Sequence, residues 1–248
     1  MLGPPAPTLA LPGGGIYFYH IAGQLTYLRE RLPAFSSSAP PGYNLVGASA
    51  GSLAAALFCY GVDFEEATAL AVRQAEDFGL FERPLGLAGV WGQLVDQWLE
   101  GLIPAEGAGF ELPSNLGLLV TPATPGALFG DEPRAQVREF RTRRDLIDAC
   151  MSSVHIPFFM DKQPARSFRG EPVIDGSFRS RPSDYSFSGS AAESVVFLDY
   201  KGDEKLGQTA GGFVKLVTPD GVYKMMELGY DFAAKRHSAG DFRAFEEI

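Results

Sequence analysis

Residues 43–60 read YNLVGASAGSLAAALFCY, and this stretch decides the class of fold. Residues 43–46 favour a short buried strand, and residues 52–60 are rich in alanine and leucine, which favours a helix. Between them, Gly47, Ser49 and Gly51 form the pattern G-x-S-x-G, which exposes a serine hydroxyl on a tight strand-to-helix turn. The pattern predicts an α/β fold with a nucleophilic serine. A serine that merely caps a helix remains the alternative at this point.

Apolar strands and amphipathic helices alternate along the rest of the chain. The predicted strands span residues 8–11, 43–46, 115–121, 137–140, 172–174 and 194–199, and the predicted helices are one that ends at Arg31 and those over residues 52–60, 64–78, 90–102, 144–153 and 224–235. This alternation predicts a mostly parallel sheet with helices on both faces. We find no repeat and no linker, so we expect one domain over residues 8–248 after a flexible, proline-rich lead-in over residues 1–7.

Composition narrows the classes of function. The 248 residues carry 21 basic and 30 acidic side chains, which gives a formal net charge of −9. An acidic surface repels phosphate backbones, so we expect no nucleic-acid partner. The two cysteines are too few for a disulfide framework or a zinc site, so we expect reduced core thiols and no metal. The sequence shows no transmembrane stretch and no signal peptide. We therefore expect an intracellular protein, cytoplasmic or peripheral on lipid surfaces, with an organelle left open.

Two further motifs carry possible chemistry. Gly13, Gly14 and Gly15 follow the first predicted strand, where successive backbone N–H groups can surround a phosphate or an oxyanion. A dinucleotide-binding turn is excluded because Phe18 stands where that motif needs its last glycine. A plain tight turn remains the alternative. The pair Asp175-Gly176 ends a short apolar strand, but such turns are common and indicate little alone.

The order of these three motifs resembles the patatin-like phospholipase family. The residues in and around these motifs resemble the animal-type branch of the family, which includes adipose triglyceride lipase and adiponutrin. Residues 52–56 (SLAAA), 145–157 (DLIDACMSSVHIP) and 173–176 (VIDG) add to the match, which covers about residues 8–235. The resemblance implies a carboxylic ester hydrolase of acyl lipids, active in lipid degradation at a membrane or lipid-droplet surface. Phospholipid, galactolipid and acylglycerol substrates are all open. The resemblance implies no metal or organic cofactor, and it leaves protein partners unknown.

The resemblance also implies roles for particular residues. Ser49 would be the nucleophile and Asp175 its base, with no histidine, and the glycines at 13–15 would supply the oxyanion hole. The chain departs from the family at Phe18, where the glycine turn usually ends in another glycine. This departure motivates an alternative, a catalytically weak lipid-binding or regulatory protein with the same fold.

Histidine offers a second alternative. Asp199 and His237 follow Ser49 in the order expected for a Ser–Asp–His esterase. His237 nevertheless ends a predicted helix beside Lys235 and Arg236, a place typical of a charge that interacts with the helix dipole. We therefore rank this triad below the serine–aspartate pair.

The helix predicted over residues 90–102 carries both tryptophans of the chain. Its apolar stripe consists of Val90, Trp91, Leu94, Val95, Trp98, Leu99 and Leu102. Such a stripe suits either a lipid-facing lid or a helix packed on the core, and the lack of lysine and arginine on its polar face favours the packed helix. The charged side chains at 141, 143–145 and 148 are interpreted as a solvated helix face and cap.

Overall fold

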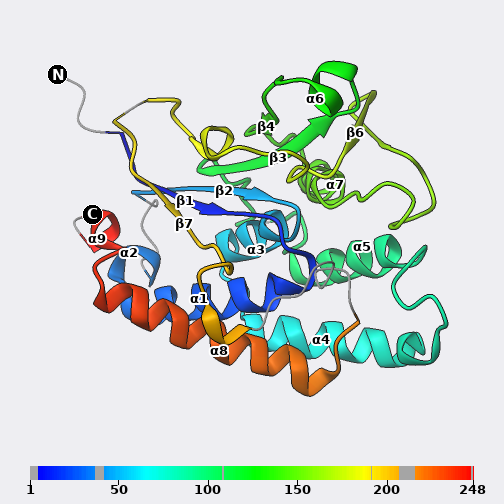
Figure 1. Cartoon of the computed structure of the whole chain (residues 1–248), viewed down its shortest axis with the longest axis horizontal. Helices are drawn as coiled ribbons and strands as arrows, with labels where there is room; N and C mark the ends of the chain where they lie inside the picture. The colour runs from blue at the N-terminus through cyan, green and yellow to red at the C-terminus, as the bar shows by residue number, and fades with distance from the viewer. Residues whose placement is uncertain (1–4, 37–41, 108, 191, 207–215, 247) are drawn as a thin grey trace.

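A seven-stranded sheet runs through the computed structural model (Figure 1), which describes residues 5–36, 42–107, 109–190, 192–206, 216–246 and 248. Part of the predicted lead-in, residues 1–4, lies outside the described residues. The strands are β1 (Thr8–Leu11), β2 (Asn44–Ala48), β3 (Leu116–Pro122), β4 (Ala135–Val137), β5 (Arg166–Phe168), β6 (Glu171–Ile174) and β7 (Val195–Phe197). Their order is β5-β6-β3-β2-β1-β7, and β4 pairs with β3.

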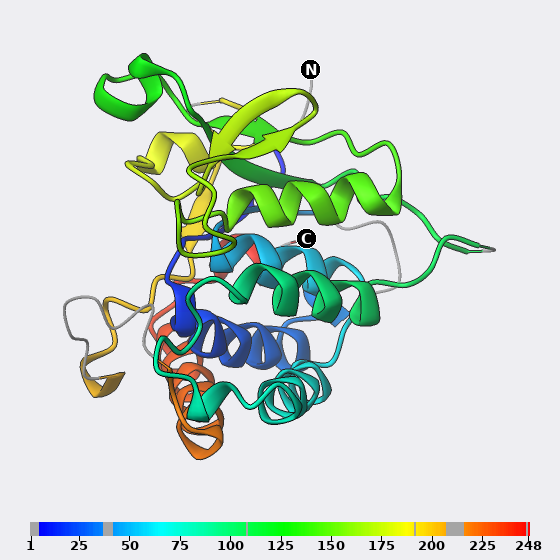
Figure 2. The same cartoon turned by 90° about the vertical axis from the view of Figure 1, so that its right-hand side faces the viewer.

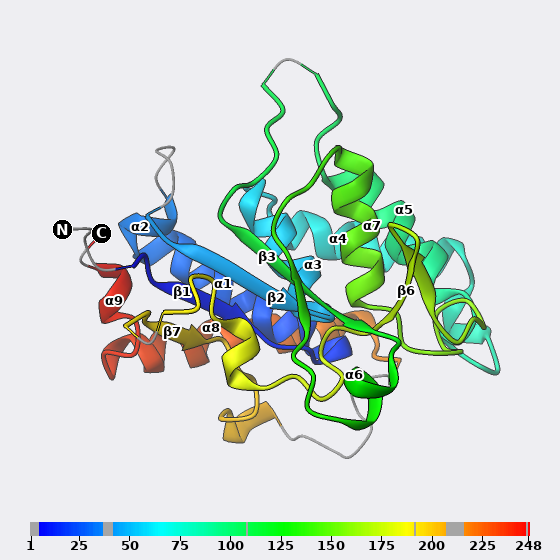
Figure 3. The same cartoon turned by 90° about the horizontal axis from the view of Figure 1, so that it is seen from above.

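The centre of the sheet is parallel. β1 pairs in parallel with β2 and with β7, and β2 pairs in parallel with β3, as the view from above also shows (Figure 3). β4 and β6 pair antiparallel with β3, and β5 and β6 form a hairpin at the edge. The carboxyl ends of β1 and β2 lie side by side, because Leu11 pairs with Gly47. This edge brings the two loops that follow those strands together.

Helices flank the sheet, so the predicted fold class is confirmed. They are α1 (Phe18–Arg31), α2 (Pro33–Ser36), α3 (Ala50–Cys59), α4 (Phe64–Asp77), α5 (Trp91–Leu102), α6 (Pro125–Phe129), α7 (Arg143–Ser153), α8 (Pro219–Ser238) and α9 (Arg243–Glu246). Figure 2 shows α7, α5 and α1 stacked in one layer beside the sheet. Among the described residues, no helix has both the length and the apolar character needed to cross a membrane.

The two faces of the sheet are buried by different parts of the chain. Leu9 and Leu45 point into the large core under the helices, whereas Ala10 and Val46 belong to a smaller cluster with Tyr185. This alternation is the period of two that a strand imposes on its side chains. The larger helical layer therefore covers one face, and residues 182–187, which begin with the 3-10 helix Pro182–Tyr185, help to cover the other.

The long helix α8 is part of the same layer. It runs alongside α1 (Figure 1), and the rings of Tyr27 and Tyr230 meet edge to face at 5.1 Å. Thr218 caps the helix through a bond from the Gly221 N–H, and Pro219 occupies its first turn. The helix therefore begins earlier than the 224–235 stretch that its periodicity predicts.

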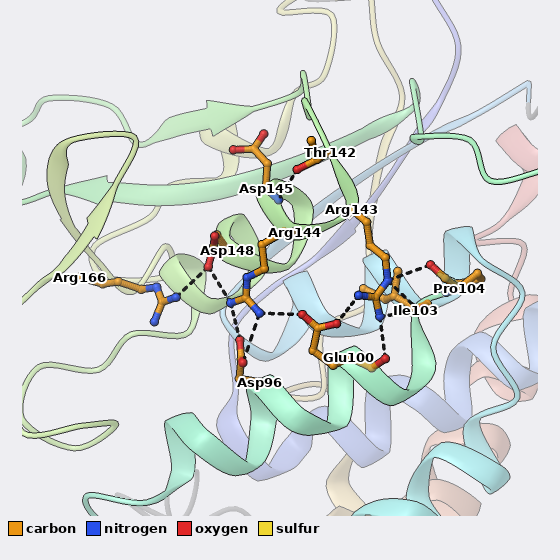
Figure 4. Close-up of polar contacts among 10 residues, drawn as sticks. All are labelled: Asp96, Glu100, Ile103, Pro104, Thr142, Arg143, Arg144, Asp145, Asp148 and Arg166. Atoms are coloured by element: carbon orange, nitrogen blue, oxygen red, sulfur yellow. Dashed lines mark hydrogen bonds and ion pairs between the residues drawn. The ribbon is translucent and has the colours of Figure 1, made fainter. Parts of the chain in front are cut away.

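Charged residues join α5 to α7 (Figure 4). Arg144 donates to Asp96 of α5 at 2.6 Å and to Asp148 of its own helix at 2.7 Å. Arg143 forms an ion pair with Glu100 and also donates to the carbonyl oxygens of residues 100 and 103 at the end of α5. The predicted solvated face is thus corrected in part: Arg143 and Arg144 bridge two helices, whereas Arg141 is exposed and Asp145 accepts its N–H at the start of α7.

Other differences from the sequence prediction lie at short, polar elements. The strand predicted over 137–140 is observed as Ala135–Val137, the residues that pair with β3. The edge strand β5 and the five-residue helix α6 escape the periodicity argument altogether, since each spans too few residues to show a pattern. Cys59 and Cys150 are free thiols on α3 and α7.

Candidate active site

Ser49 stands between the end of β2 and the first residue of α3. Its φ of 51° lies in the left-handed region, which costs an L-residue free energy unless the surroundings enforce it. The turn packs tightly, since a Cβ on Gly51 would lie 2.0 Å from the Leu11 carbonyl oxygen and one on Gly47 would lie 2.5 Å from the Gly51 oxygen. The G-x-S-x-G residues therefore form a strained elbow that presents the Ser49 side chain at the carboxyl edge of the sheet.

Asp175 follows the last residue of β6. Its backbone N–H donates to the carbonyl oxygen of His155 at 2.9 Å, and the Gly176 N–H donates to that of Ser153 at 2.9 Å. On the opposite side, the Thr121 hydroxyl of β3 donates to the Asp175 carbonyl oxygen at 2.8 Å. These bonds hold the Asp-Gly turn between β3 and the C-terminal end of α7.

The structure brings Ser49 and Asp175 together, although 126 residues separate them in sequence. Ser49 Oγ donates to Asp175 Oδ2 at 2.7 Å. The other carboxylate oxygen, Oδ1, accepts the Ser177 hydroxyl at 2.6 Å and the Ser177 N–H at 2.8 Å. Ser177 thereby orients the carboxylate so that Oδ2 remains for Ser49. The Ser49 and Asp175 side chains are both buried.

Electrostatics make this carboxylate more basic than usual. Burial raises the pKa of the Asp175 carboxyl above its ordinary value, and hydrogen bonds from Ser177 and Ser49 offset part of that rise. An aspartate with a raised pKa accepts a proton from a hydroxyl more readily than a solvated aspartate does. The pair can therefore activate the Ser49 hydroxyl as a nucleophile.

The glycine turn adjoins this pair. Gly13 lies against Ser49 and Ser177, since a Cβ placed on it would come within 2.9 Å of both side chains. Gly15 has a φ of 54° and opens the 3-10 turn Gly15–Tyr17, which leads into α1. Phe18 lies outside the turn as the first residue of α1. The glycine turn thus lies directly beside the Ser49 side chain.

An apolar pocket opens beside Ser49, with a volume of about 740 Å³ that includes the space at its mouth. Gly15, Phe18 and Tyr19 line it from the glycine turn and α1, and Ser49, Ala50 and Leu53 line it from the elbow. Helix α4 contributes Ala71, Gln74 and Ala75, and α5 contributes Trp91, Leu94, Val95 and Trp98. A lining of this apolar character suits apolar ligands and chains.

Helix α5 packs against the core, as the lack of lysine and arginine on its polar face predicted. Trp98 is buried and donates its indole N–H to the Ala67 carbonyl oxygen at 2.8 Å. Trp91 is only half buried and lines the pocket. The two tryptophans therefore face the candidate site.

Two of the three histidines, His20 and His237, lie away from Ser49 and Asp175. His237 contacts the Tyr27 hydroxyl at 3.0 Å and Glu246 at 2.9 Å, so both of its ring nitrogens have partners away from Ser49. His20 is buried and bonds to Asp203 at 2.9 Å. The structure does not bring His237 to Ser49, in contrast to Asp175. No group of three or more potential metal ligands occurs among the described residues.

Sequence reasoning assigned no role to Ser153, Ser177 or Tyr200. Ser153 Oγ accepts the Ser49 N–H at 2.9 Å, and the Tyr200 ring lies against Gly14. Ser177 follows the Asp-Gly pair directly and could have been found as a residue that bonds back to an Asp side chain. The other two belong to distant segments, and no local pattern marks them.

Comparison with known proteins places these residues in a family. The model of the patatin-like phospholipase family matches residues 9–182, which include the elbow and the Asp-Gly turn. Among solved structures, VipD from Legionella pneumophila is 12% identical with a TM-score of 0.48, and the alignment covers 96% of this chain and 67% of VipD. The type III effector protein ExoU is 17% identical with a TM-score of 0.43, over 98% of this chain and 54% of ExoU. No curated protein matches the chain.

Proposed function

Because the chain belongs to the patatin-like phospholipase family, we propose that it is a serine hydrolase that cleaves carboxylic ester bonds of acyl lipids. Ser49 is the nucleophile and Asp175 is its base. The observation that carries this proposal is the 2.7 Å hydrogen bond from Ser49 Oγ to Asp175 Oδ2 at the wall of an apolar pocket. An acyl chain in that pocket would place its ester carbonyl beside the serine.

The proposed reaction has two halves. Ser49 Oγ attacks the ester carbonyl carbon while Asp175 Oδ2 accepts the hydroxyl proton. The carbonyl oxygen becomes an oxyanion, which N–H groups of the 13–15 turn stabilise. The ester C–O bond then breaks, and Asp175 returns the proton to the leaving alcohol. Water repeats these steps on the Ser49 ester and releases the fatty acid.

We further propose that residues 8–248 act as one domain. The packing of α8 against α1 supports this extent, because it joins the segment beyond the family match to the core. Placement in the animal-type branch, with adipose triglyceride lipase and adiponutrin, stays a prediction from the sequence motifs. The head group of the substrate is a further open choice among phospholipid, galactolipid and acylglycerol.

Labelling with a fluorophosphonate probe tests the proposal, because the probe reacts only with an activated serine. We expect the parent protein to be labelled stoichiometrically and Ser49→Ala to be unlabelled. Asp175→Asn should be labelled far more slowly, since Asn cannot accept the Ser49 proton. The exposed Ser183→Ala and Asp131→Asn variants serve as matched controls and should label like the parent.

The outcomes separate the alternatives. Labelling that persists in Asp175→Asn would overturn the pair and redirect attention to His237. A folded parent that is never labelled would favour the catalytically weak lipid-binding protein. If these results support the Ser49–Asp175 pair, the next measurement is the release of fatty acids from a panel of lipids.

A further inference from the structure

Four large apolar side chains face solvent on the two chain segments that also carry the pocket residues Ala75, Trp91 and Ile156. Phe78 is 38% exposed, Phe81 37%, Leu85 75% and Phe158 65%. Soluble proteins rarely leave several such side chains uncovered on neighbouring segments without a binding role. These four residues are called the apolar rim below.

The segments that carry the rim are held in place. Leu80 and Leu87 are buried and pack with Leu94 of α5, so that part of residues 78–92 points inward. The Gly89 N–H donates to the Phe159 carbonyl oxygen at 2.7 Å, and the Gly92 N–H donates to that of Met160 at 3.2 Å. These bonds fasten the segment after α4 to the segment after α7, and the rim side chains project from this joined support.

The rim continues the wall of the pocket. Ala75 and Trp91, which line the pocket, lie just before and just after the segment that carries Phe78 and Leu85. Ile156, two residues before Phe158, lines it as well. In Figure 1 this segment lies on the right, at the end toward which β1 and β2 run, and Figure 2 views the molecule from that side.

The charge of the rim segments is balanced. Residues 78–92 and 156–163 contain two acidic side chains, Glu82 and Asp161, and two basic ones, Arg83 and Lys162. The chain as a whole has a net charge of −9. An anionic bilayer would therefore repel the protein, and no cationic cluster on these segments offsets that repulsion. Burial of apolar side chains remains as the driving force for contact with a lipid layer.

We propose that the apolar rim docks the protein on a lipid surface without net charge, such as a phosphatidylcholine bilayer. Insertion of the rim places the pocket mouth at the lipid layer, so an acyl chain reaches Ser49 along apolar walls without crossing water. The inference rests on the proposed function of the Ser49 site and adds the surface on which that site works.

Flotation with phosphatidylcholine vesicles tests the docking surface. All proteins carry Ser49→Ala, so that the vesicles are not degraded. We expect the Ser49→Ala protein to bind, and the further substitutions Leu85→Asp and Phe158→Asp together to lower the partition coefficient about tenfold or more. Phe129→Asp is the matched control, because Phe129 is 80% exposed on α6, away from the rim (Figure 1). It should bind like its parent.

Charge gives a second readout. Replacing half of the phosphatidylcholine by phosphatidylserine should weaken binding, and added salt should not abolish binding to phosphatidylcholine alone. Binding that requires phosphatidylserine and disappears in salt would overturn the proposal. The proposal would also be overturned if the rim variant bound vesicles as well as its parent, or if Phe129→Asp lost as much binding as the rim variant. If the parent bound no vesicles, the rim would instead be a contact surface for another protein.

A soluble ester separates this proposal from the proposed function. With Ser49 intact, the rim variant should hydrolyse p-nitrophenyl butyrate like the parent and lose turnover of vesicle lipid. If the parent hydrolyses no ester while the vesicle results hold, the hydrolase proposal fails and the docking surface stands. If all proteins hydrolyse the soluble ester and none binds vesicles, the docking surface fails alone.

Discussion

The side-chain oxygen of Ser153 accepts the backbone N–H of Ser49 at 2.9 Å, across 104 residues of sequence. The backbone oxygen of the same residue accepts the Gly176 N–H at 2.9 Å. The last residue of α7 thus holds both the strained elbow and the turn that carries Asp175. The relative position of the proposed nucleophile and base depends on this helix end.

Removing that hydroxyl should loosen the elbow. Ser153→Ala leaves the buried Ser49 N–H without its acceptor, so we expect the free energy of unfolding to fall by about 1–3 kcal/mol and ester hydrolysis to slow. Ser152→Ala is the control, since the Ser152 hydroxyl donates within its own helix, to the Asp148 carbonyl oxygen. Denaturant unfolding and hydrolysis of a soluble ester measure both effects. Equal rates in the two variants would contradict the positioning role.

The raised pKa of Asp175 predicts a pH dependence of activity. The base must be ionised to accept the Ser49 proton, so kcat/KM should fall as the pH drops through the raised pKa of Asp175. The midpoint of this fall in kcat/KM should lie at a pH above the ordinary pKa of an aspartate, about 3.9. A profile that stays flat down to that value would exclude Asp175 as the base. The measurement needs a soluble ester, so that lipid binding does not change with pH.

The raised pKa of Asp175 also predicts how the free energy of unfolding changes with pH. Burial raises the pKa of Asp175 in the folded protein, so between the unfolded and folded values the native state binds more protons. Its contribution to stability is therefore present at low pH and is lost as the pH rises through the folded value. Asp175→Asn removes the buried charge and should raise the free energy of unfolding at neutral pH. A less stable Asp175→Asn at neutral pH would contradict this sign.

Tyr200 should act as a positioning residue for the glycine turn. Its ring lies so close to Gly14 that a Cβ there would be 2.5 Å from the ring, and it stacks on Tyr17 at 4.3 Å. The buried His20–Asp203 pair fastens the segment that follows Tyr200 to α1. We expect Tyr200→Ala to lower kcat about tenfold to a hundredfold with a smaller change in KM. Tyr200→Phe, which keeps the ring, should retain more of kcat, and equal losses in both variants would argue against ring packing as the cause.

Phe18 should limit the acyl chain that the pocket accepts. Its buried ring lines the pocket and meets Trp98 edge to face at 5.4 Å. Phe18→Ala enlarges the pocket and should shift the preferred p-nitrophenyl ester toward longer chains, at a cost of about 3–5 kcal/mol in stability. Phe18→Leu is the milder variant if the alanine protein does not fold. An unchanged chain-length profile in a folded variant would show that the chain binds elsewhere.

The two arginines of the α5–α7 bridge should differ in their effect on stability. Arg143 is largely buried and donates to carbonyl oxygens at the end of α5, at 2.6 Å to Glu100 and 2.8 Å to Pro104. Arg143→Ala should therefore cost about 2 kcal/mol. The Arg144 side chain is 44% exposed, so Arg144→Ala should cost about 1 kcal/mol or less, and less still in high salt. A larger loss of stability in Arg144→Ala than in Arg143→Ala would contradict this ranking of the two arginines.

Long periodic elements of the fold could be read from the sequence. The apolar spacing through α1, α4 and α5 predicts helices within a few residues of their observed ends, because one buried face imposes the pattern. Strand β5 lacks such a pattern, since it pairs only with β6 in a hairpin at the sheet edge. The bridge between α5 and α7 was also missed, because opposite charges on separate helices give no signal until the helices pack.

The sequence by itself determined the α/β class, the elbow at Ser49 and the strand end at Asp175, because local sterics and periodicity act within a few residues. Only the tertiary structure decided which side chains meet there. It placed Asp175, and not His237, beside Ser49, made Ser153 the acceptor that supports the Ser49 turn, and placed Phe18 in the pocket wall. These contacts join segments about a hundred residues apart, and their geometry depends on the parallel pairing of β1, β2 and β3 and on the packing of α7.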